Sequence, residues 1–246
     1  MATIYRIFKK ELSGYFNSPL AYIFLIVFLV LGPALFFNLS SGGFFKARQA
    51  SLGGFFAFLP WLFLFFVPAI AMRIWAEEKR SGTEELLMTM PVRDWEVVIG
   101  KYLSALTLII VALAFTLPLV YVVRHFADPK TPVDWGPVWC GYVGAFLLGA
   151  AMLAIGTWAS SLTVNQIVAF ILTCAIIFLL IICGLPAVSD VLPSGAAEVV
   201  TKFSLMSHFM SLYRGVLDLA DVAYYLSIVV FFLFLNVRSV ESRKWK

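Results

Sequence analysis

Charged residues cluster in one stretch of the chain, residues 74–101, which separates two very apolar runs. Its sequence is IWAEEKRSGTEELLMTMPVRDWEVVIGK. Within it, Gly82 allows the chain to turn, and Thr83 can cap the N-terminus of a short helix. Acidic residues follow in the first turn, where they suit the helix dipole, and Pro91 marks the end. The stretch therefore predicts a short helix that starts at Thr83 and ends before Pro91, between the two apolar runs.

The predicted helix is polar at its start and apolar on one side, where Leu86, Leu87 and Met90 form a patch. A helix of this kind, flanked by membrane spans, indicates a docking element for another protein at the membrane surface. The alternative is a solvated loop with an incidental helix, and the residue types alone favour neither interpretation.

Catalytic and nucleotide-binding motifs are missing from the sequence. His125 and His208 are isolated and have no metal-ligand spacing, so they are interpreted as surface residues. There is no GxSxG elbow and no GxxxxGK[ST] loop, and the only Gly-Lys pair is Gly100-Lys101. Without such a loop the chain has no P-loop site for ATP, so any ATP-driven work needs another subunit. We expect no metal and no cofactor in this chain.

The composition is that of an integral membrane protein. Of the 246 residues, 62% are hydrophobic and 13% are charged, against roughly half and a quarter in soluble domains. The net charge of +4 comes from short basic clusters at the ends of apolar runs, which indicate topology rather than nucleic-acid binding. Six apolar runs are long enough to cross a bilayer as helices: residues 19–38, 55–72, 102–123, 138–159, 166–184 and 222–237. The fold class is therefore an all-α membrane protein, a single transmembrane domain over residues 1–246.

Smaller features complete this prediction. Residues 3–16 have an amphipathic, basic pattern and are expected to lie as a helix in the membrane interface. Pro60 and Pro68 predict an irregular second span. Residues 185–221 have helical patterning but are too polar to cross, so they form an outer helical connection. The fourth span has small residues at helix-packing spacing: Ala145, Gly149, Ala150 and Ala154.

Charge distribution sets the orientation and excludes one class of transporter. Of the 18 Lys and Arg residues, twelve lie at the two termini, at Arg73 and in the central charged stretch, and six lie in the other loops. The positive-inside rule then places both termini and the central charged stretch in the cytoplasm. All 14 Asp and Glu residues lie outside the six spans, which argues against a proton- or sodium-coupled carrier.

Together these parts resemble an ABC-2 type (type V exporter-like) transporter permease. The segment AEEKRSGTEELLMTMPVRDWEVVIGKYL is similar to that family's AEE, GT, ELL, P and GK pattern. NQIVAF and SLMSHFMSLYRGVLDLADVAYYLSIVVFFLFL look like the gliding-motility-associated, GldF-type subunit. In that family helix 77–90 is the coupling helix that sits in a groove of the ATPase. The resemblance assigns ATPase coupling to these residues: Glu77, Glu78, Arg80, Gly82, Thr83, Glu84, Glu85, Leu86, Leu87 and Met90.

The same resemblance implies a set of partners in the bacterial inner membrane. These are two copies of a separately encoded ATPase that bind ATP and Mg, a second permease copy as a homodimer or heterodimer, and a GldG-type auxiliary membrane protein. The expected function is export, or mechanical work, driven by ATP. The alternative is a scaffold that anchors an ATPase-driven assembly and transports nothing. The aromatic, uncharged spans favour a hydrophobic or amphipathic cargo, or no small solute at all.

Overall fold

A computed structural model describes residues 2–39, 44, 50–83, 92–128, 132–191 and 193–242. Every regular element in this part of the chain is an α-helix, which confirms the all-α prediction. The predicted coupling residues Glu84, Glu85, Leu86, Leu87 and Met90 lie outside the described residues.

The first half of the chain contributes one amphipathic helix and the first apolar helices. Their bounds are α1 Ala2–Asn17, α2 Pro19–Leu39, α4 Gly53–Ala71, α5 Arg73–Ser81, α7 Asp94–Thr116 and α8 Pro118–Phe126. The helix that contains the start of the predicted third span, α7, begins at Asp94 rather than at residue 102. It begins there because the Glu96 carboxylate accepts the Arg93 N–H and caps the first turn. Pro118 then begins a separate helix, which carries the chain on to Phe126.

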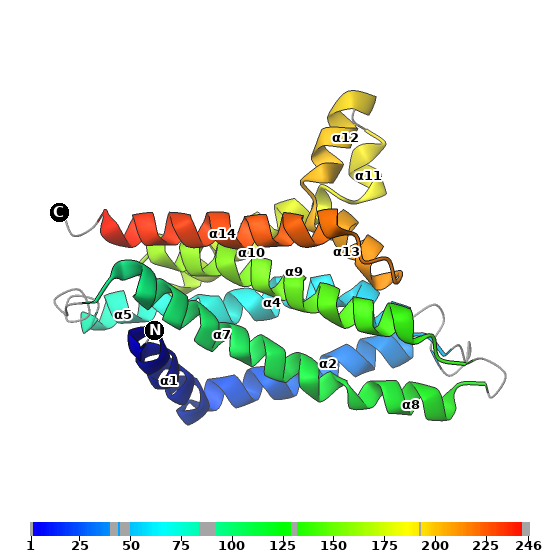
Figure 1. Cartoon of the computed structure of the whole chain (residues 1–246), viewed down its shortest axis with the longest axis horizontal. Helices are drawn as coiled ribbons and strands as arrows, with labels where there is room; N and C mark the ends of the chain where they lie inside the picture. The colour runs from blue at the N-terminus through cyan, green and yellow to red at the C-terminus, as the bar shows by residue number, and fades with distance from the viewer. Residues whose placement is uncertain are drawn as a thin grey trace.

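The second half contains the longest helix and the outer connection. The bounds are α9 Trp135–Leu162, α10 Gln166–Ile182, α11 Pro186–Ser189, α12 Ser194–Lys202, α13 Leu205–Tyr213 and α14 Leu219–Glu241. In its described residues, the predicted outer connection 185–221 thus contains three short helices, α11, α12 and α13. In Figure 1, α11 and α12 project away from the remaining helices, near the end of α14 where that helix begins.

The long helices run roughly side by side (Figure 1). The N-terminus, α5 and the C-terminal end of α14 lie at one end of this bundle, and α8 and α13 lie toward the other. Among the residues that the structure describes, five helical stretches are long and apolar enough to cross a membrane: Ala21–Asn38, Gly53–Ser81, Asp94–Phe126, Trp135–Leu162 and Leu219–Glu241. Gln166–Ile182 is also apolar but shorter. The protein is thus a multi-pass membrane protein, and the sixth span stays a prediction.

Helix α9 lies at the centre of the bundle because small residues let its neighbours approach closely. A Cβ on Gly141 would lie 2.4 Å from the Phe56 ring, and one on Gly156 would lie 2.5 Å from the Ala71 Cβ. The four small residues predicted to pack, Ala145, Gly149, Ala150 and Ala154, are all buried. Close backbone approach of this kind drives helix association in lipid, where the hydrophobic effect between helices is absent.

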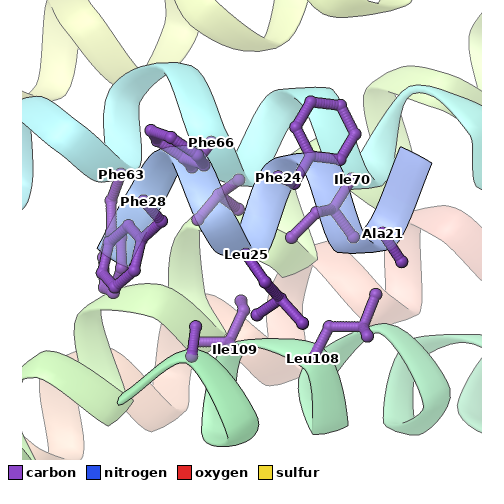
Figure 2. Close-up of a pocket in the computed structure, with 11 residues that line it drawn as sticks. Ala21, Phe24, Leu25, Phe28, Phe63, Phe66, Ile70, Leu108 and Ile109 are labelled. Carbon is purple, nitrogen blue, oxygen red and sulfur yellow. The ribbon is translucent and has the colours of Figure 1, made fainter. Parts of the chain in front are cut away.

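Aromatic side chains of α2 and α4, and aliphatic side chains of α2 and α7, fill the space between these three helices (Figure 2). Phe28 stacks on Phe63 with ring centroids 5.9 Å apart and meets Phe66 edge-on at 5.3 Å. The cavity left among these helices is apolar and measures about 30 Å³. That volume holds little more than one water molecule. Part of the aromatic run of α4 is therefore packing between helices.

The prediction of an irregular second span was wrong, because α4 continues as a helix through both prolines. Proline has no N–H, so Pro68 leaves the carbonyl of Leu64 without its helical partner. The thiol of Cys174 on α10 donates to that carbonyl at 3.3 Å. A neighbouring helix thus satisfies the freed group and keeps α4 continuous.

Candidate coupling site at the charged end of the bundle

The charged stretch begins as helix α5, which α9 holds in place. The hydroxyl of Ser160 accepts the backbone N–H groups of Trp75 and Ala76, each at 3.2 Å, and donates to the carbonyl of Met72 at 3.0 Å. The first N–H groups of a helix lack partners within the helix, so Ser160 satisfies two donors in the first turns of α5. Trp75 and Ala76 are buried, so the first turns of α5 are packed inside the bundle and held at the end of α9.

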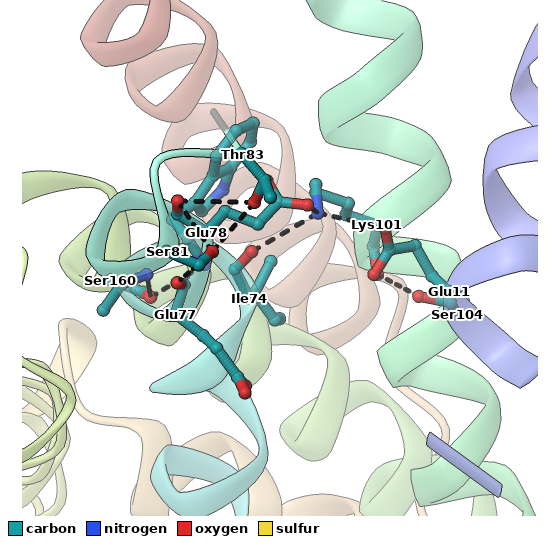
Figure 3. Close-up of polar contacts among 11 residues, drawn as sticks. Glu11, Ile74, Glu77, Glu78, Ser81, Thr83, Lys101, Ser104 and Ser160 are labelled. Carbon is teal, nitrogen blue, oxygen red and sulfur yellow. Dashed lines mark hydrogen bonds and ion pairs between the residues drawn. The ribbon is translucent and has the colours of Figure 1, made fainter. Parts of the chain in front are cut away.

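A buried lysine connects α5 to two other helices (Figure 3). Lys101 on α7 is 2% exposed. Its ammonium group lies 2.5 Å from Oε1 of Glu78 on α5 and 3.2 Å from Oε1 of Glu11 on α1. It also donates to the carbonyl of Ile74 at 3.4 Å and lies 5.3 Å from the centre of the Trp75 ring. We call Glu11, Glu78 and Lys101 the three-helix ion cluster.

The three-helix ion cluster carries one positive and two negative groups. The side chains of Glu78 and Glu11 are 18% and 22% exposed, so water reaches both only in part. In the described part of the chain, Oε2 of Glu78 is buried without a hydrogen-bond partner. Taking such charges out of water costs several kcal/mol per ion, which the ion pairs offset only while all partners stay in place. The cluster therefore fixes one arrangement of α1, α5 and α7.

A second ion pair lies beside this cluster. The guanidinium of Arg73 meets the carboxylate of Glu77 through two bonds, at 2.7 Å and 3.1 Å, and reaches the Ser18 hydroxyl at 3.3 Å. Ser18 lies between α1 and α2, so this pair ties α5 to the start of the first span. Burial, and then the charge of Glu11, raises the pKa of Tyr15, so its phenol stays protonated in this environment.

The two ion pairs surround a cavity of about 200 Å³. Its lining includes Glu11, Tyr15, Arg73, Glu78 and Lys101. Among the described residues, no three His, Cys, Asp or Glu side chains stand together as metal ligands. The lining of this cavity consists of structural ion pairs and contains no catalytic group. It is therefore suited to holding α1, α5 and α7 together and to transmitting movement between them.

The predicted coupling residues separate into two groups in the structure. Glu78 is turned inward to Lys101 and Glu77 pairs with Arg73, whereas Arg80 is exposed. The prediction of one helix over residues 77–90 was wrong, because residues 77–81 belong to α5, which Gly82 ends. Helix α5 already starts at Arg73, because Ile74, Trp75 and Ala76 continue the buried face.

Gly82 and Thr83 lie at the point where the chain leaves α5. Gly82 has φ 70°, a conformation that ends the helix and that glycine adopts without strain. The hydroxyl of Thr83 contacts Ser81 Oγ at 3.0 Å and donates to the Glu78 carbonyl at 3.4 Å. Within the described residues these bonds point back to α5, and the residues that Thr83 was predicted to cap lie outside them.

Sequence reasoning missed Glu11, Lys101 and Ser160 as members of this site. Glu11 and Lys101 are 90 positions apart in the chain, so no local pattern joins them. The sequence did contain one indication of the site: Lys101 is a charged residue at the start of an apolar run, directly after Gly100, which allows another helix to approach. A Cβ on Gly100 would lie 2.8 Å from the Ile7 side chain, which shows how closely α1 and α7 approach.

Comparison with known families agrees with this architecture. The family model described as ABC-2 family transporter protein matches residues 37–237. The chain belongs to the ABC-2 transporter family. A comparison with curated proteins gives no match. ABC-2 proteins of this kind are membrane permease components of ABC transporters, which work with an ABC ATPase and are not themselves the nucleotide-binding enzyme.

Proposed function

We propose that this ABC-2 permease couples ATP hydrolysis by a separate ATPase to export, or to mechanical work, across a bacterial inner membrane. The observation that carries the proposal is the three-helix ion cluster, which joins α1, α5 and α7 at the end where the chain leaves α5. The residues that follow, 84–90, would form the coupling helix seated in the ATPase. They lie only a few residues beyond Glu78.

The argument is mechanical. Coupling between distant sites needs a connected element that moves as one body between discrete arrangements. Ser160 fixes the start of α5 to α9, Lys101 fixes its middle to α7, and Lys79 donates to the Ser161 carbonyl at the end of α9. A push on residues 84–90 would therefore move α5 together with the ends of α7 and α9. Glu11 would carry the same movement to α1.

The arrangement of the ends supports the proposed topology. The N-terminus, α5 and the C-terminal end of α14 lie at one end of the bundle (Figure 1), and the basic residues of the sequence concentrate there. By the positive-inside rule this end would face the cytoplasm, where an ATPase and its ATP and Mg are available. The complex would contain two ATPase subunits, a second permease copy and a GldG-type membrane protein.

The test is to purify the permease with the ATPase that co-elutes, reconstitute the complex in vesicles, and measure ATP turnover. We expect Glu84→Lys/Glu85→Lys to abolish co-elution, because it reverses the charge of the predicted ATPase contact. Lys101→Met should keep co-elution but lower the ATPase stimulation given by the permease. Lys202→Met is the matched control, since Lys202 forms an exposed pair with Glu198.

The outcomes distinguish the proposed function from its alternative. No co-eluting ATPase with a folded permease would refute the coupling role of residues 84–90. An ATPase that binds and turns over, in sealed vesicles that move no cargo, would instead support the scaffold. Normal ATPase stimulation in Lys101→Met would refute the mechanical role of the three-helix ion cluster.

A further inference from the structure

The C-terminal end of α12 is held by side chains from the elements that follow it. The last carbonyl groups of a helix lack partners within the helix. Here the hydroxyl of Ser207 donates to the Thr201 carbonyl at 2.7 Å, and the hydroxyl of Tyr224 donates to the Phe203 carbonyl at 2.6 Å. Between them, the Lys202 carbonyl lies 3.0 Å from Nε2 of His208.

His208 has a hydrogen-bond acceptor at each ring nitrogen. A carbonyl can only accept, so Nε2 carries a proton that it donates to Lys202. Nδ1 lies 2.6 Å from Oδ1 of Asp221, the closer of the two contacts. An ionised carboxylate also only accepts, so a second proton must lie between Nδ1 and Asp221. The pair therefore holds one proton more than a neutral imidazole and a free carboxylate would hold.

The surroundings favour the charged form of this pair. The imidazole ring stacks on the Tyr224 ring at 3.9 Å, which stabilises a cation. His208 Nε2 meets the carbonyl end of α12, and Asp221 lies in the first turn of α14, so each charge faces the helix end of opposite polarity. Asp221 is 6% exposed, so little water competes for the proton.

The other titratable groups near the pair do not change this balance. On α14, Tyr224 and Tyr225 donate their hydroxyls to the Phe203 and Leu205 carbonyls and are neutral. On α12, the hydrogen bond from Lys202 lowers the pKa of the exposed Glu198 carboxyl, so these two charges compensate each other. At the end of α10, the free cysteine Cys183 lies near Tyr224. No second carboxylate or ammonium group in the described part contacts His208.

We propose that His208 and Asp221 form a proton-binding site that holds the projecting arm, which consists of α11 (Pro186–Ser189) and α12 (Ser194–Lys202), against the start of α14. With the proton bound, His208 bridges the end of α12 and Asp221. Without it, a neutral imidazole can donate to only one of these two acceptors, and the other bond is lost. The site goes beyond the proposed coupling function, because it lies on the opposite side of the molecule from α5 and responds to pH rather than to ATP.

The direct test counts protons on the ring by nitrogen NMR of histidine-labelled permease in nanodiscs at pH 7.5. The chain has only two histidines, so His125→Gln assigns the signals. We expect both ring nitrogens of His208 to carry protons in the wild type. Asp221→Asn should leave one, because an asparagine amide can donate to Nδ1 and replace the shared proton. One proton in both proteins would overturn the proposal.

A second measurement tests the arm itself. Hydrogen-exchange protection factors for the amides of residues 196–202 are measured at pH 6.5 and pH 9, since protection factors remove the chemical effect of pH. In the wild type we expect protection to fall about tenfold at the higher pH, the effect of one hydrogen bond to a charged group. In Asp221→Asn it should stay constant, because that bond needs no titrating proton. Cys183→Ala is the control for titration of the nearby thiol. Equal pH dependence of the protection factors in the wild type and Asp221→Asn would refute the proposed link between α12 and α14.

Discussion

Lys101→Met is the sharpest perturbation of the coupling site. Methionine keeps the length and the apolar stem of the side chain, so packing against Trp75 changes little. The ammonium group is lost, and with it the bonds to Glu78, Glu11 and the Ile74 carbonyl. Two carboxylates then remain close together, partly buried and without their cation.

The size of the effect follows from the exposure of these carboxylates. Removing one partner of a fully buried ion pair costs roughly 3–5 kcal/mol. Glu78 and Glu11 are 18% and 22% exposed, so partial hydration places the cost near the lower end, at about 3 kcal/mol. For a chain of this length each kcal/mol lowers Tm by roughly 2–4 °C. We therefore expect a decrease of about 6–12 °C.

The assay is thermal unfolding in nanodiscs, followed by tryptophan fluorescence. Lys202→Met, which removes an exposed pair, should change Tm by no more than about 2 °C. Adding Glu78→Gln to Lys101→Met should recover part of the loss, because one uncompensated charge is removed. An equal shift in Lys101→Met and Lys202→Met, or a double variant less stable than Lys101→Met, would refute the reasoning.

Three further perturbations test the packing and the charged end with the same measurement. Gly156→Ala should lower stability by about 1–3 kcal/mol, because the new Cβ would lie 2.5 Å from the Ala71 Cβ. Gly14→Ala is the control: its new Cβ meets nothing within 4 Å, so it should be neutral or stabilising. Equal effects of the two substitutions would contradict the close approach of α9 and α4. Ser160→Ala should cost about 1–3 kcal/mol and reduce ATPase stimulation, since two N–H groups of α5 lose their acceptor; unchanged stimulation would separate this hydroxyl from coupling. Burial raises the pKa of Tyr15, so its stabilising contribution is complete below about pH 10, the value for an unfolded tyrosine, and declines as pH rises further. Tyr15→Phe should therefore have a flatter loss of Tm between about pH 10 and pH 11 than the wild type, and parallel curves would exclude that cause.

The helices could be predicted from the sequence because their signals are local. Apolar runs of bilayer length, the amphipathic pattern of residues 3–16 and the polar outer connection each lie within one segment. The bounds were less accurate where a tertiary contact decides them. Helix α5 starts at Arg73 because Trp75 and Ala76 are buried and because the Ser160 hydroxyl accepts the N–H groups of both residues. Ser160 lies 85 and 84 positions further along the chain, so no local pattern predicts these bonds.

The site could be predicted only in part, for the same reason. The charged stretch was recognisable, yet which of its charges face inward depends on partners from α1 and α7. The contact of Glu78 with the ATPase stays a prediction, whereas its pairing with Lys101 was not predicted from the sequence. His208 was interpreted as an isolated surface residue, and it contacts Asp221, Tyr224 and the Lys202 carbonyl, which the chain brings together only by folding.

Burying the charges of the three-helix ion cluster costs free energy, which indicates that the cluster does more than stabilise the fold. Well-packed apolar residues often replace a buried ion pair without loss of stability. Apolar contacts have no preferred direction, however, whereas an ammonium group held by two carboxylates and a carbonyl fixes three helices at defined positions. We therefore expect the variant Glu11→Leu/Glu78→Leu/Lys101→Met to keep much of the wild-type Tm but to lose ATPase stimulation. Loss of both would mean that the cluster serves stability alone, and retention of both would mean that apolar packing transmits the movement equally well.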